Sequence, residues 1–311
     1  MPRKKKVEES PQIESERKPV EMVEQEIREL IKTFYQIQKL RVAVELRTKL
    51  TKFSLCPNGH LIPLREGSRE RCPICDAPVK IVSKEPSPIL LNILDVLKNL
   101  ERGDILKRLN ESVKDHILWR SYLSKIKGVG PVMAAYLISV LNPVKFETVS
   151  KMWKYCGLHV VDGKAPRRVA GQKTDWNPFA RAMMWRLGES FRMVGGFYRM
   201  MYEKFFEDCT RNHKDWTKAH CIAHARRVTV KLFLSHYYYL GRKMLGLNAR
   251  EPYSCVVKPH ECIPPIFDEY EKDEEKVIYQ LYLKDTWSWE TFKKWIDAYK
   301  KWLKAREEYE K

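Results

Sequence analysis

The stretch Lys125-Ile126-Lys127-Gly128-Val129-Gly130-Pro131-Val132-Met133-Ala134-Ala135-Tyr136-Leu137 joins two apolar helical patterns through a glycine turn. Gly128 and Gly130 permit a positive φ in the turn and let another molecule approach the bare backbone closely. Pro131 is typical of the first turn of a helix, where its missing N–H removes no intrahelical bond. The sequence therefore predicts a helix that ends near Ile126, a tight turn around Val129, and a second helix that starts at Pro131.

The start of the second helix has the properties of an anion site. The first N–H groups of a helix point outward without intrahelical partners, and the helix dipole places partial positive charge at this end. This arrangement resembles a helix-hairpin-helix, a module that grips a nucleic-acid phosphate without reading the bases. We predict that the contacts come from Lys125, Lys127, Gly128, Val129 and Gly130. The alternative is a plain helical hairpin with a glycine turn.

Positive charge is concentrated in the segment that carries this turn. The 311 residues have a net charge of +18, and the stretch from Leu118 to Asn248 contains 23 Lys and Arg against 8 Asp and Glu. A basic, aromatic-rich segment favours a polyanionic partner, most often nucleic acid. The alternative is a solvated surface of the kind found in thermophilic proteins, which normally balances lysine with glutamate.

The composition favours a cytoplasmic protein without a membrane span. No apolar run reaches the roughly 18 residues that a span requires, and the charged N-terminus has no apolar secretion-signal segment. In a reducing compartment, the eight cysteines indicate metal ligands or free thiols rather than a disulfide framework. The length allows two domains with a substantial core. Together with the basic charge, these features predict a nucleoid-associated location.

Two long helical patterns occupy the N-terminal third of the chain. Residues 1–18 form a basic tail that we expect to be disordered. Apolar residues then recur at spacings of three and four over residues 19–50. A matching pattern covers residues 87–117, with a break predicted at Gly103. We expect an antiparallel helical hairpin over residues 19–125, or a coiled coil that also forms a homodimer, and the sequence leaves both open.

Four metal-ligating side chains lie between these helical patterns. They form two pairs, each within a short turn, and a β-prone run follows each turn. Zinc binds four N or S ligands in a tetrahedron, and tight turns commonly present them in pairs. We therefore predict a zinc ribbon inserted at residues 53–83. Because four protein ligands leave no open position for chemistry, we expect one structural Zn²⁺ per chain, held by Cys56, His60, Cys72 and Cys75.

A basic helical segment follows the glycine turn. A short helix is predicted over residues 146–158, with Gly157 at its end, and a loop with an Asp-Gly turn comes next. Asn177-Pro178 predicts the start of another helix, and a long helix covers about residues 216–245. Further phosphate contacts are predicted for Lys164, Arg167, Arg168, Arg181 and Arg186, while contacts from Arg65, Arg69 and Arg71 of the ribbon are left open.

Two other groups of cysteine and histidine have looser spacing. The first contains two histidines one helical turn apart, for which core packing or phosphate contact is the commoner role. The second lies in a Pro-rich loop within residues 249–311, where the sequence then predicts C-terminal amphipathic helices. The groups are His220 and His224 with Cys209, His213 or Cys221, and Cys255 with His260 and Cys262.

An ordered set of motifs extends from the glycine turn over about residues 118–245. It comprises Ile126–Gly130 with Ala134 and Ala135, then Phe146, Tyr155–Leu158, Gly163-Lys164, Asn177, Arg181 and the stretch from Ala223 to Arg226. This order resembles the C-terminal domain of the insertion-sequence transposases of the IS-one-ten / IS-one-sixteen / IS-nine-hundred-two group. The resemblance implies a helical domain at residues 118–248 that binds nucleic acid, with DNA favoured over RNA.

The chain departs from the family pattern at two places. Family members carry an N-terminal RuvC-like domain with metal-binding carboxylates, and we expect that this chain lacks it, because a tail, two helices and a ribbon are predicted there. The family also has a nucleophilic serine just before the Gly-Lys of the basic loop, where this sequence has Asp162. A carboxylate cannot form the phosphoserine linkage that strand transfer would use. The resemblance therefore implies DNA binding without autonomous strand transfer.

We thus expect a mainly α-helical protein, with a long helical hairpin and an inserted zinc ribbon, followed by the helix-hairpin-helix domain. Its predicted function is to bind the phosphate backbone of DNA. The first alternative is an active transposase or nuclease component, with Asp162 as its catalytic candidate and Asp175, Glu189 and His159 as further groups. The second alternative is an RNA- or ribosome-associated zinc-ribbon factor.

Overall fold

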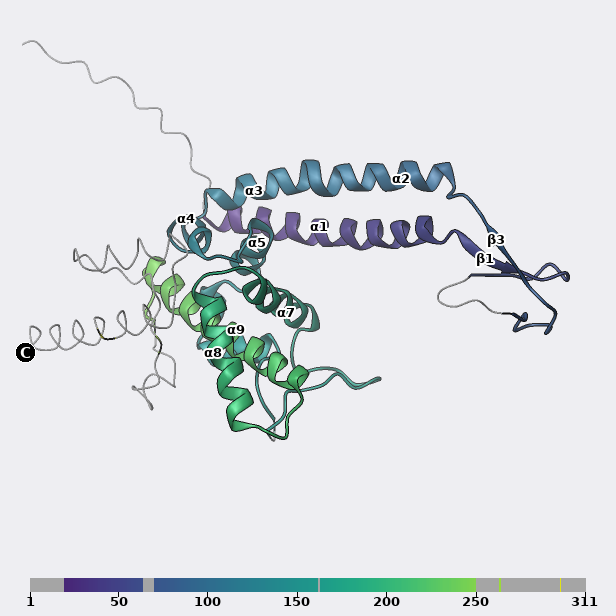
Figure 1. Cartoon of the computed structure of the whole chain (residues 1–311). Coiled ribbons are helices and arrows are strands. Elements are labelled where there is room, and N and C mark those ends of the chain that lie inside the picture. The colour runs from purple at the N-terminus through teal and green to yellow at the C-terminus, as the bar shows by residue number, and fades with distance from the viewer. Residues whose placement is uncertain (1–19, 64–69, 162, 250–262, 264–296, 298–311) are drawn as a thin grey trace, which may run out of the picture.

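The structure, a computed structural model, describes residues 20–63, 70–161, 163–249, 263 and 297. Within these ranges the chain is mainly helical, with one small sheet (Figure 1), so the predicted fold class is confirmed in this coarse form. The predictions for the tail at residues 1–18 and for nearly all of residues 249–311, the Cys255, His260 and Cys262 group included, lie outside the described residues.

A long antiparallel pair of helical arms, which we call the stalk, extends from the rest of the molecule (Figure 1). The first arm is α1 (Val20–Lys49). The second consists of α2 (Pro88–Asn99), a π-helical segment (Leu100–Ile105) and α3 (Leu106–Lys114). The break predicted at Gly103 is therefore a local π-helical widening, and the arm continues through it.

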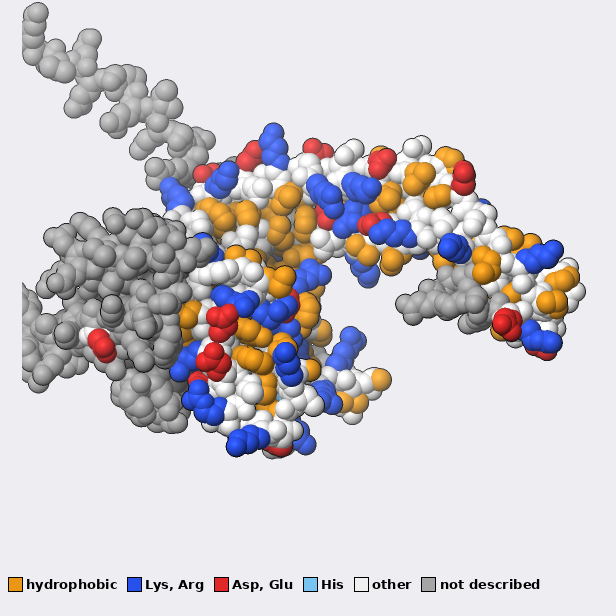
Figure 2. All heavy atoms as spheres, viewed as in Figure 1, with side chains coloured by type: hydrophobic (Ala, Val, Ile, Leu, Met, Phe, Trp, Pro, Cys, Tyr) orange, Lys and Arg blue, Asp and Glu red, His pale blue; other side chains and the backbone are white. Residues whose placement is uncertain are grey.

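The two halves of the stalk are held by different contacts. Near the body, Ile27 and Ile31 of α1 belong to the main hydrophobic core. Farther out, a separate small cluster of Val44, Leu94 and Leu97 is buried between the arms. The distal half therefore depends on contacts between its own two arms, and many of its remaining apolar side chains stay at the surface (Figure 2).

A buried carboxylate also joins the two arms. Glu101 of the π-helical segment is 4% exposed, pairs with Arg41 of α1, and accepts a hydrogen bond from Nε2 of Gln38 at 3.1 Å. Arg41 also pairs with Glu45 at 2.7 Å. Because a buried charge is tolerated only when it is paired and hydrogen-bonded, these contacts tie the arms together at this level.

A three-stranded antiparallel sheet lies at the far end of the stalk (Figure 1). Its strands are β1 (Lys52–Leu55), β2 (Leu61–Pro63) and β3 (Lys80–Ser83), in the order β2-β1-β3. Phe53 pairs with Pro63 on one side and with Val82 on the other. The two β-prone runs predicted from the sequence form β2 and β3, and β1 is an additional central strand.

The remaining helices form a helical body around one core. Helices α6, α7 and α9 correspond to those predicted at residues 146–158, from residue 177, and over residues 216–245. The helix predicted to end near Ile126 is interrupted at Tyr122, where φ is −135° and ψ is −62°. The elements are α4 (Ile117–Ser121), a 3-10 turn (Leu123–Lys125), α5 (Pro131–Ser139), a 3-10 turn (Pro143–Lys145), α6 (Val149–Tyr155), α7 (Pro178–Met193), α8 (Phe197–Asn212) and α9 (Lys218–Met244).

Local sequence explains where one body helix starts and where another ends. The side chain of Asn177 caps α7 by accepting hydrogen bonds from the backbone N–H groups of Phe179 and Ala180. Gly157 has φ +64°, the left-handed conformation that glycine favours after a helix such as α6.

Among the described helices, none is long and apolar enough to cross a membrane.

Candidate nucleic-acid interface and metal centre

The glycine turn before α5 is fastened to α7 on one side. Gly128 has φ +93°, and its carbonyl oxygen accepts a hydrogen bond from the hydroxyl of Ser190 at 2.8 Å. The backbone conformation therefore favours glycine, and a Cβ at this position would crowd Cδ1 of Phe191 at 3.0 Å. The side chain of Val129 is buried. This half of the turn belongs to the core of the body.

The other side of the turn is open. Gly130 is exposed, it is the N-cap residue of α5 with φ −84° and ψ 171°, and a Cβ built on it would meet no atom within 4 Å. Because glycine has no side chain, it cannot cap the first N–H groups of α5. Lys125 and Lys127 are partly buried, and the Cβ of Lys127 lies close to Gly196 at the start of α8. The turn therefore presents bare backbone at a helix N-terminus.

Three partly buried cations, which we call the cation cluster, lie beside the start of α7. They are Arg181 of α7 and Arg227 and Lys231 of α9. Burial lowers the pKa of each, the charge of Arg181 lowers the pKa of Arg227 further, and Arg227 does the same to Lys231. Among the residues that the structure describes, none of the three has an ion pair with a carboxylate. The cluster is thus positively charged without a protein counter-ion in the described part.

Two tryptophan rings contact the charged groups of the cation cluster. The ammonium of Lys231 lies 4.2 Å from the ring centroid of Trp153, and the guanidinium of Arg181 lies 5.4 Å from that of Trp176. Trp153 also donates a hydrogen bond from its ring nitrogen to the backbone oxygen of Lys231 at 3.2 Å. Cation–π contacts of this kind hold a charged side chain in place without neutralising it.

The remaining predicted cations fall into two places. Lys164, Arg167 and Arg168 are exposed on the loop between α6 and α7, and Arg181 donates a hydrogen bond to the backbone oxygen of Pro166 in the same loop. Arg186 lies instead toward the stalk, with its guanidinium 5.6 Å from the ring centroid of Tyr35. The loop and Arg181 are thus brought together, and Arg186 is separate from them.

Sequence reasoning missed Arg227 and Lys231 as candidate site residues. Their spacing of four places them on one face of α9, which is a signal that the sequence did contain. Their approach to Arg181 depends on the close packing of α7 against α9. At Gly188 a Cβ would lie 2.3 Å from Cγ of Arg226, so the two helices meet at that glycine.

Asp175 and Glu189, two acidic candidates for an enzyme site, form ion pairs with different partners. Asp175 lies 3.5 Å from the ammonium of Lys154 and 3.6 Å from Nε2 of His159. Glu189 forms ion pairs with Arg192 and with Arg226, and these contacts lower its pKa. Asp162 lies outside the described residues.

The four predicted metal ligands come together at the end of the sheet where β1 ends and β2 and β3 begin. Their ligand atoms all lie within 4.8 Å of one another, and they are Cys56, His60, Cys72 and Cys75. Two tight turns present them: the N–H of Gly59 bonds to the carbonyl of Cys56 at 3.0 Å, and the N–H of Asp76 to that of Cys72 at 2.8 Å. This Cys/His cluster can hold a metal ion.

The electrostatics of the cluster favour a thiolate at one ligand. A hydrogen bond from the backbone of Ala77 is the main cause that lowers the pKa of Cys75 to about 6, whereas burial raises the pKa of Cys56. Thiolate is the form of cysteine that binds metals, so the turn that carries Cys75 prepares this ligand.

The more loosely spaced cysteines and histidines of α8 and α9 are arranged differently. The rings of His213 and His220 stack on Trp216, at centroid distances of 4.0 and 3.9 Å. Cys209 and Cys221 form a separate thiol pair, with sulfur atoms 2.9 Å apart between α8 and α9. In the described ranges, the Cys/His cluster at the sheet is the one group of three or more metal-ligating side chains.

Comparison with known proteins identifies part of this body. Residues 120–190, which include the glycine turn, α5, α6 and most of α7, match the family model described as Transposase IS116/IS110/IS902 family. No curated protein and no solved structure matches the chain. The resemblance inferred from the order of motifs is thus confirmed over residues 120–190, which are similar to the C-terminal domain of this transposase family.

Proposed function

We propose that the chain binds DNA through its body, with the Gly128–Gly130 turn and the cation cluster contacting the phosphate backbone. The observation that carries this proposal is the cation cluster, because partly desolvated cations are costly unless an anion compensates them. A phosphodiester supplies such an anion. The match of residues 120–190 to a transposase family supports DNA as the partner.

The turn contributes a second contact of the same type. At Gly130, open space and bare backbone at the N-terminus of α5 suit a phosphate oxygen, and Lys125 and Lys127 add positive charge nearby. Lys164, Arg167, Arg168 and Arg186 extend the proposed contacts. We expect binding that follows the backbone, depends steeply on salt and depends weakly on base sequence.

The decisive experiment changes charge at Gly130 without weakening the helix. Its β-region dihedrals suit an N-cap side chain, so Gly130→Asp and Gly130→Asn both cap α5 and keep or raise its stability. The aspartate alone places a negative charge where a phosphate would lie. We expect DNA affinity to fall by about tenfold or more for Gly130→Asp relative to Gly130→Asn at low salt. Equal affinities of the two variants would remove the turn from the interface.

A second measurement tests the cation cluster. Replacing Arg227 by glutamine removes one charge, and we expect the slope of log affinity against log salt to become shallower by about one unit. Lys218→Gln, an exposed lysine at the start of α9, is the matched control. A slope that changes equally in both variants would show that general charge, rather than the cluster, determines binding.

We also propose that the body does not perform strand transfer by itself. Asp162 stands where the transposase pattern has its nucleophilic serine, and a carboxylate cannot form the phosphoserine intermediate. Metal-dependent cleavage of DNA by the purified chain, lost in Asp162→Ala, would favour the enzyme instead.

The metal that we propose for the Cys/His cluster is zinc. Zn–S bonds of about 2.3 Å and Zn–N bonds of about 2.0 Å in a tetrahedron separate the ligand atoms by about 3.5 to 3.8 Å. Cys56 Sγ lies 3.7 Å from Cys75 Sγ and 3.4 Å from His60 Nδ1, which is 3.7 Å from Cys72 Sγ. We expect one zinc per chain by elemental analysis, and less than half an equivalent would count against a zinc ribbon.

The stalk supports a proposed homodimer. Besides the face of α2 that packs on α1, a second apolar row, Ile89, Ile93, Val96 and Leu100, recurs at coiled-coil spacing and is 70%, 41%, 58% and 37% exposed. Such a row is costly in water and suits a second copy of the stalk. We expect a dimer by sedimentation that dissociates in Ile93→Glu.

The preference for DNA over RNA belongs to the same proposal, and a nucleoid location would follow from it. Parallel titrations with duplex DNA, branched DNA and structured RNA at one salt concentration test it. Tighter binding of structured RNA would favour an RNA- or ribosome-associated factor.

A further inference from the structure

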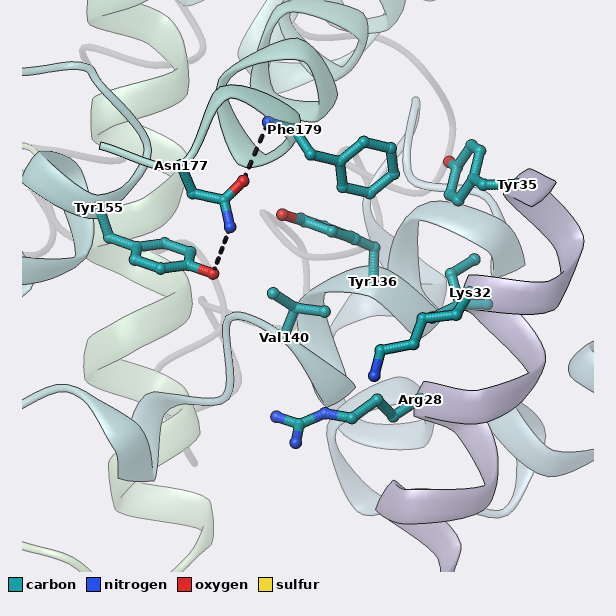
Figure 3. A pocket seen from close by; sticks show the side chains of 9 residues that line it. Arg28, Lys32, Tyr35, Tyr136, Val140, Tyr155, Asn177 and Phe179 are labelled. Atoms are coloured by element: carbon teal, nitrogen blue, oxygen red, sulfur yellow. Dashed lines mark hydrogen bonds between the residues drawn. The ribbon is translucent and has the colours of Figure 1, made fainter. Parts of the chain in front are cut away.

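A cavity of about 360 Å³ lies where the stalk meets the body. Its walls come from α1, α5, the end of α6 and the start of α7, and Figure 3 shows the side chains that line it. The volume is at the lower end of the range for small-molecule sites, which fits one compact group rather than an extended segment.

Aromatic rings form much of the wall. Phe179 packs edge-to-face against Tyr35, at a centroid distance of 5.1 Å, and against Tyr136, at 5.6 Å. Phe179 is 45% exposed, so the array reaches the surface. A planar ring can therefore enter the cavity and stack on aromatic faces, as unpaired bases do on nucleic-acid-binding proteins.

One buried hydroxyl in the wall lacks a partner. Tyr136 is 1% exposed, and its hydroxyl makes no hydrogen bond within the described residues. Figure 3 shows this hydroxyl pointing toward Asn177, whose amide groups already bond to the hydroxyl of Tyr155 and the N–H of Phe179. Since a buried polar group without a partner is costly, a polar ligand edge at this place would satisfy it.

Charge in the cavity favours an anionic ligand. Arg28 and Lys32 come from successive turns of α1, and their charged ends point toward the cavity in Figure 3. Arg28 donates one hydrogen bond to the backbone oxygen of Ser139 at 3.1 Å, which leaves other N–H groups of the guanidinium available. Among the described residues, none of those that line the cavity carries a carboxylate.

We propose that this cavity holds a single unpaired nucleotide of a bound DNA strand, with its base against the aromatic rings and its phosphate beside Arg28 and Lys32. The inference rests on the proposed DNA binding and adds a recognition site for a base outside the double helix. Only an aromatic ring with a polar edge and an attached anion uses all three features of the wall. The cost of leaving the base stack is smallest at an unpaired position, so such positions are selected.

The test measures binding of the full chain to three duplexes. One is fully paired, one carries a single unpaired adenosine, and one carries an abasic nucleotide at the same position. One stacked base is worth about 1 to 3 kcal/mol, so we expect the adenosine bulge to bind about tenfold more tightly than the abasic bulge. Val140→Phe fills the cavity from α5 and should reduce this ratio to about one, with the paired duplex bound as before.

Matched variants separate the cavity from the fold. Val144→Phe adds the same bulk at an exposed position outside the cavity and should keep the ratio. Tyr136→Phe keeps the ring, removes the hydroxyl, and should lower the ratio about threefold, which provides a test if Val140→Phe does not fold. When 5-iododeoxyuridine replaces the unpaired adenosine, photochemical crosslinks from it should form to Tyr35, Tyr136 or Phe179.

The outcomes distinguish this inference from the function on which it rests. Failure to bind any duplex would contradict the proposed DNA binding. Tight binding of all three duplexes with equal affinity would overturn the cavity proposal alone, as would a preference that survives Val140→Phe. Competition by free adenosine monophosphate at strand-equivalent concentrations would show a site for free nucleotides and would also overturn it.

Discussion

The hydroxyl of Tyr122 lies 2.9 Å from the hydroxyl of Tyr198, although 76 residues separate the two in the chain. Tyr198 in turn lies 2.9 Å from Nδ1 of His236, whose Nε2 lies 2.7 Å from the backbone oxygen of Ile263. The first three residues are buried and come from the break after α4, from α8 and from α9. This chain of hydrogen bonds connects the break after α4 with α8 and α9 through the body core.

Removing the middle hydroxyl should destabilise the body. In Tyr198→Phe, the hydroxyl of Tyr122 and Nδ1 of His236 both lose the hydrogen bond to Tyr198 in the buried core. We expect a loss of about 1 to 3 kcal/mol in the free energy of unfolding, measured by urea denaturation. Tyr239→Phe, in the same helix as His236 but only partly buried, should cost less. A fully stable Tyr198→Phe would show that the network contributes nothing.

The same network predicts a loss of stability in mild acid. Burial lowers the pKa of His236 to about 4, below its ordinary value of about 6.5, so the folded state keeps this imidazole neutral. The stabilisation is present above about pH 6.5 and is lost as the pH falls toward 4, because the unfolded state takes up the proton first. Between pH 7 and pH 5 we expect a loss of about 2 kcal/mol from this group.

Unfolding curves of the wild type and of His236→Gln over this pH range test the assignment. The variant should be less stable at pH 7, and its disadvantage should shrink as the pH is lowered. Parallel pH profiles would assign the acid sensitivity to other groups, such as His224, whose pKa burial also lowers.

Gly188→Ala should separate α7 from α9. The new Cβ would lie 2.3 Å from Cγ of Arg226 and 2.9 Å from Cγ2 of Val230, whose side chain is buried at 1% exposed. Overpacking of this kind costs about 1 to 3 kcal/mol and outweighs the higher helix propensity of alanine. Gly103→Ala, where a Cβ meets nothing within 4 Å, is the control and should be neutral or stabilising in thermal melts.

Removing the proposed zinc should unfold the sheet and leave the body folded. The strands are only three or four residues long, and Ile74 and Ile81 are 66% and 55% exposed, so this part has little core of its own. After chelation, we expect hydrogen exchange to increase over residues 52–83 but to stay unchanged over α5 to α9. Loss of protection throughout the chain would contradict an independent sheet.

Local patterns in the sequence predict the stalk, the Cys/His cluster and the glycine turn well. The ligands of the cluster stand within 20 residues, and the spacing of apolar residues in α1 is a property of one helix. The cation cluster and the cavity are different, because both depend on helices far apart in the chain. Arg28 and Tyr136 meet in one wall only through the packing of α1 on α5, and no local pattern specifies that contact.

Two local expectations also changed for tertiary reasons. The helix before the turn breaks at Tyr122, whose side chain is committed to Tyr198 in the core. The helical arm does not end at Gly103, because the π-helical segment continues through it and keeps Glu101 directed toward Arg41 on the opposite arm. In both cases a contact across the core, rather than residue propensity, determines the local backbone.

The stalk also fixes the distance between the helical body and the sheet. Thirty residues of α1 correspond to about 45 Å, and the sheet lies beyond its end. Double-stranded DNA rises about 3.4 Å per base pair, so this distance equals about 13 base pairs, more than one helical repeat. A duplex bound along the stalk would contact the helical body and the sheet at two separate positions. The length of the stalk would then fix the distance between these two contacts.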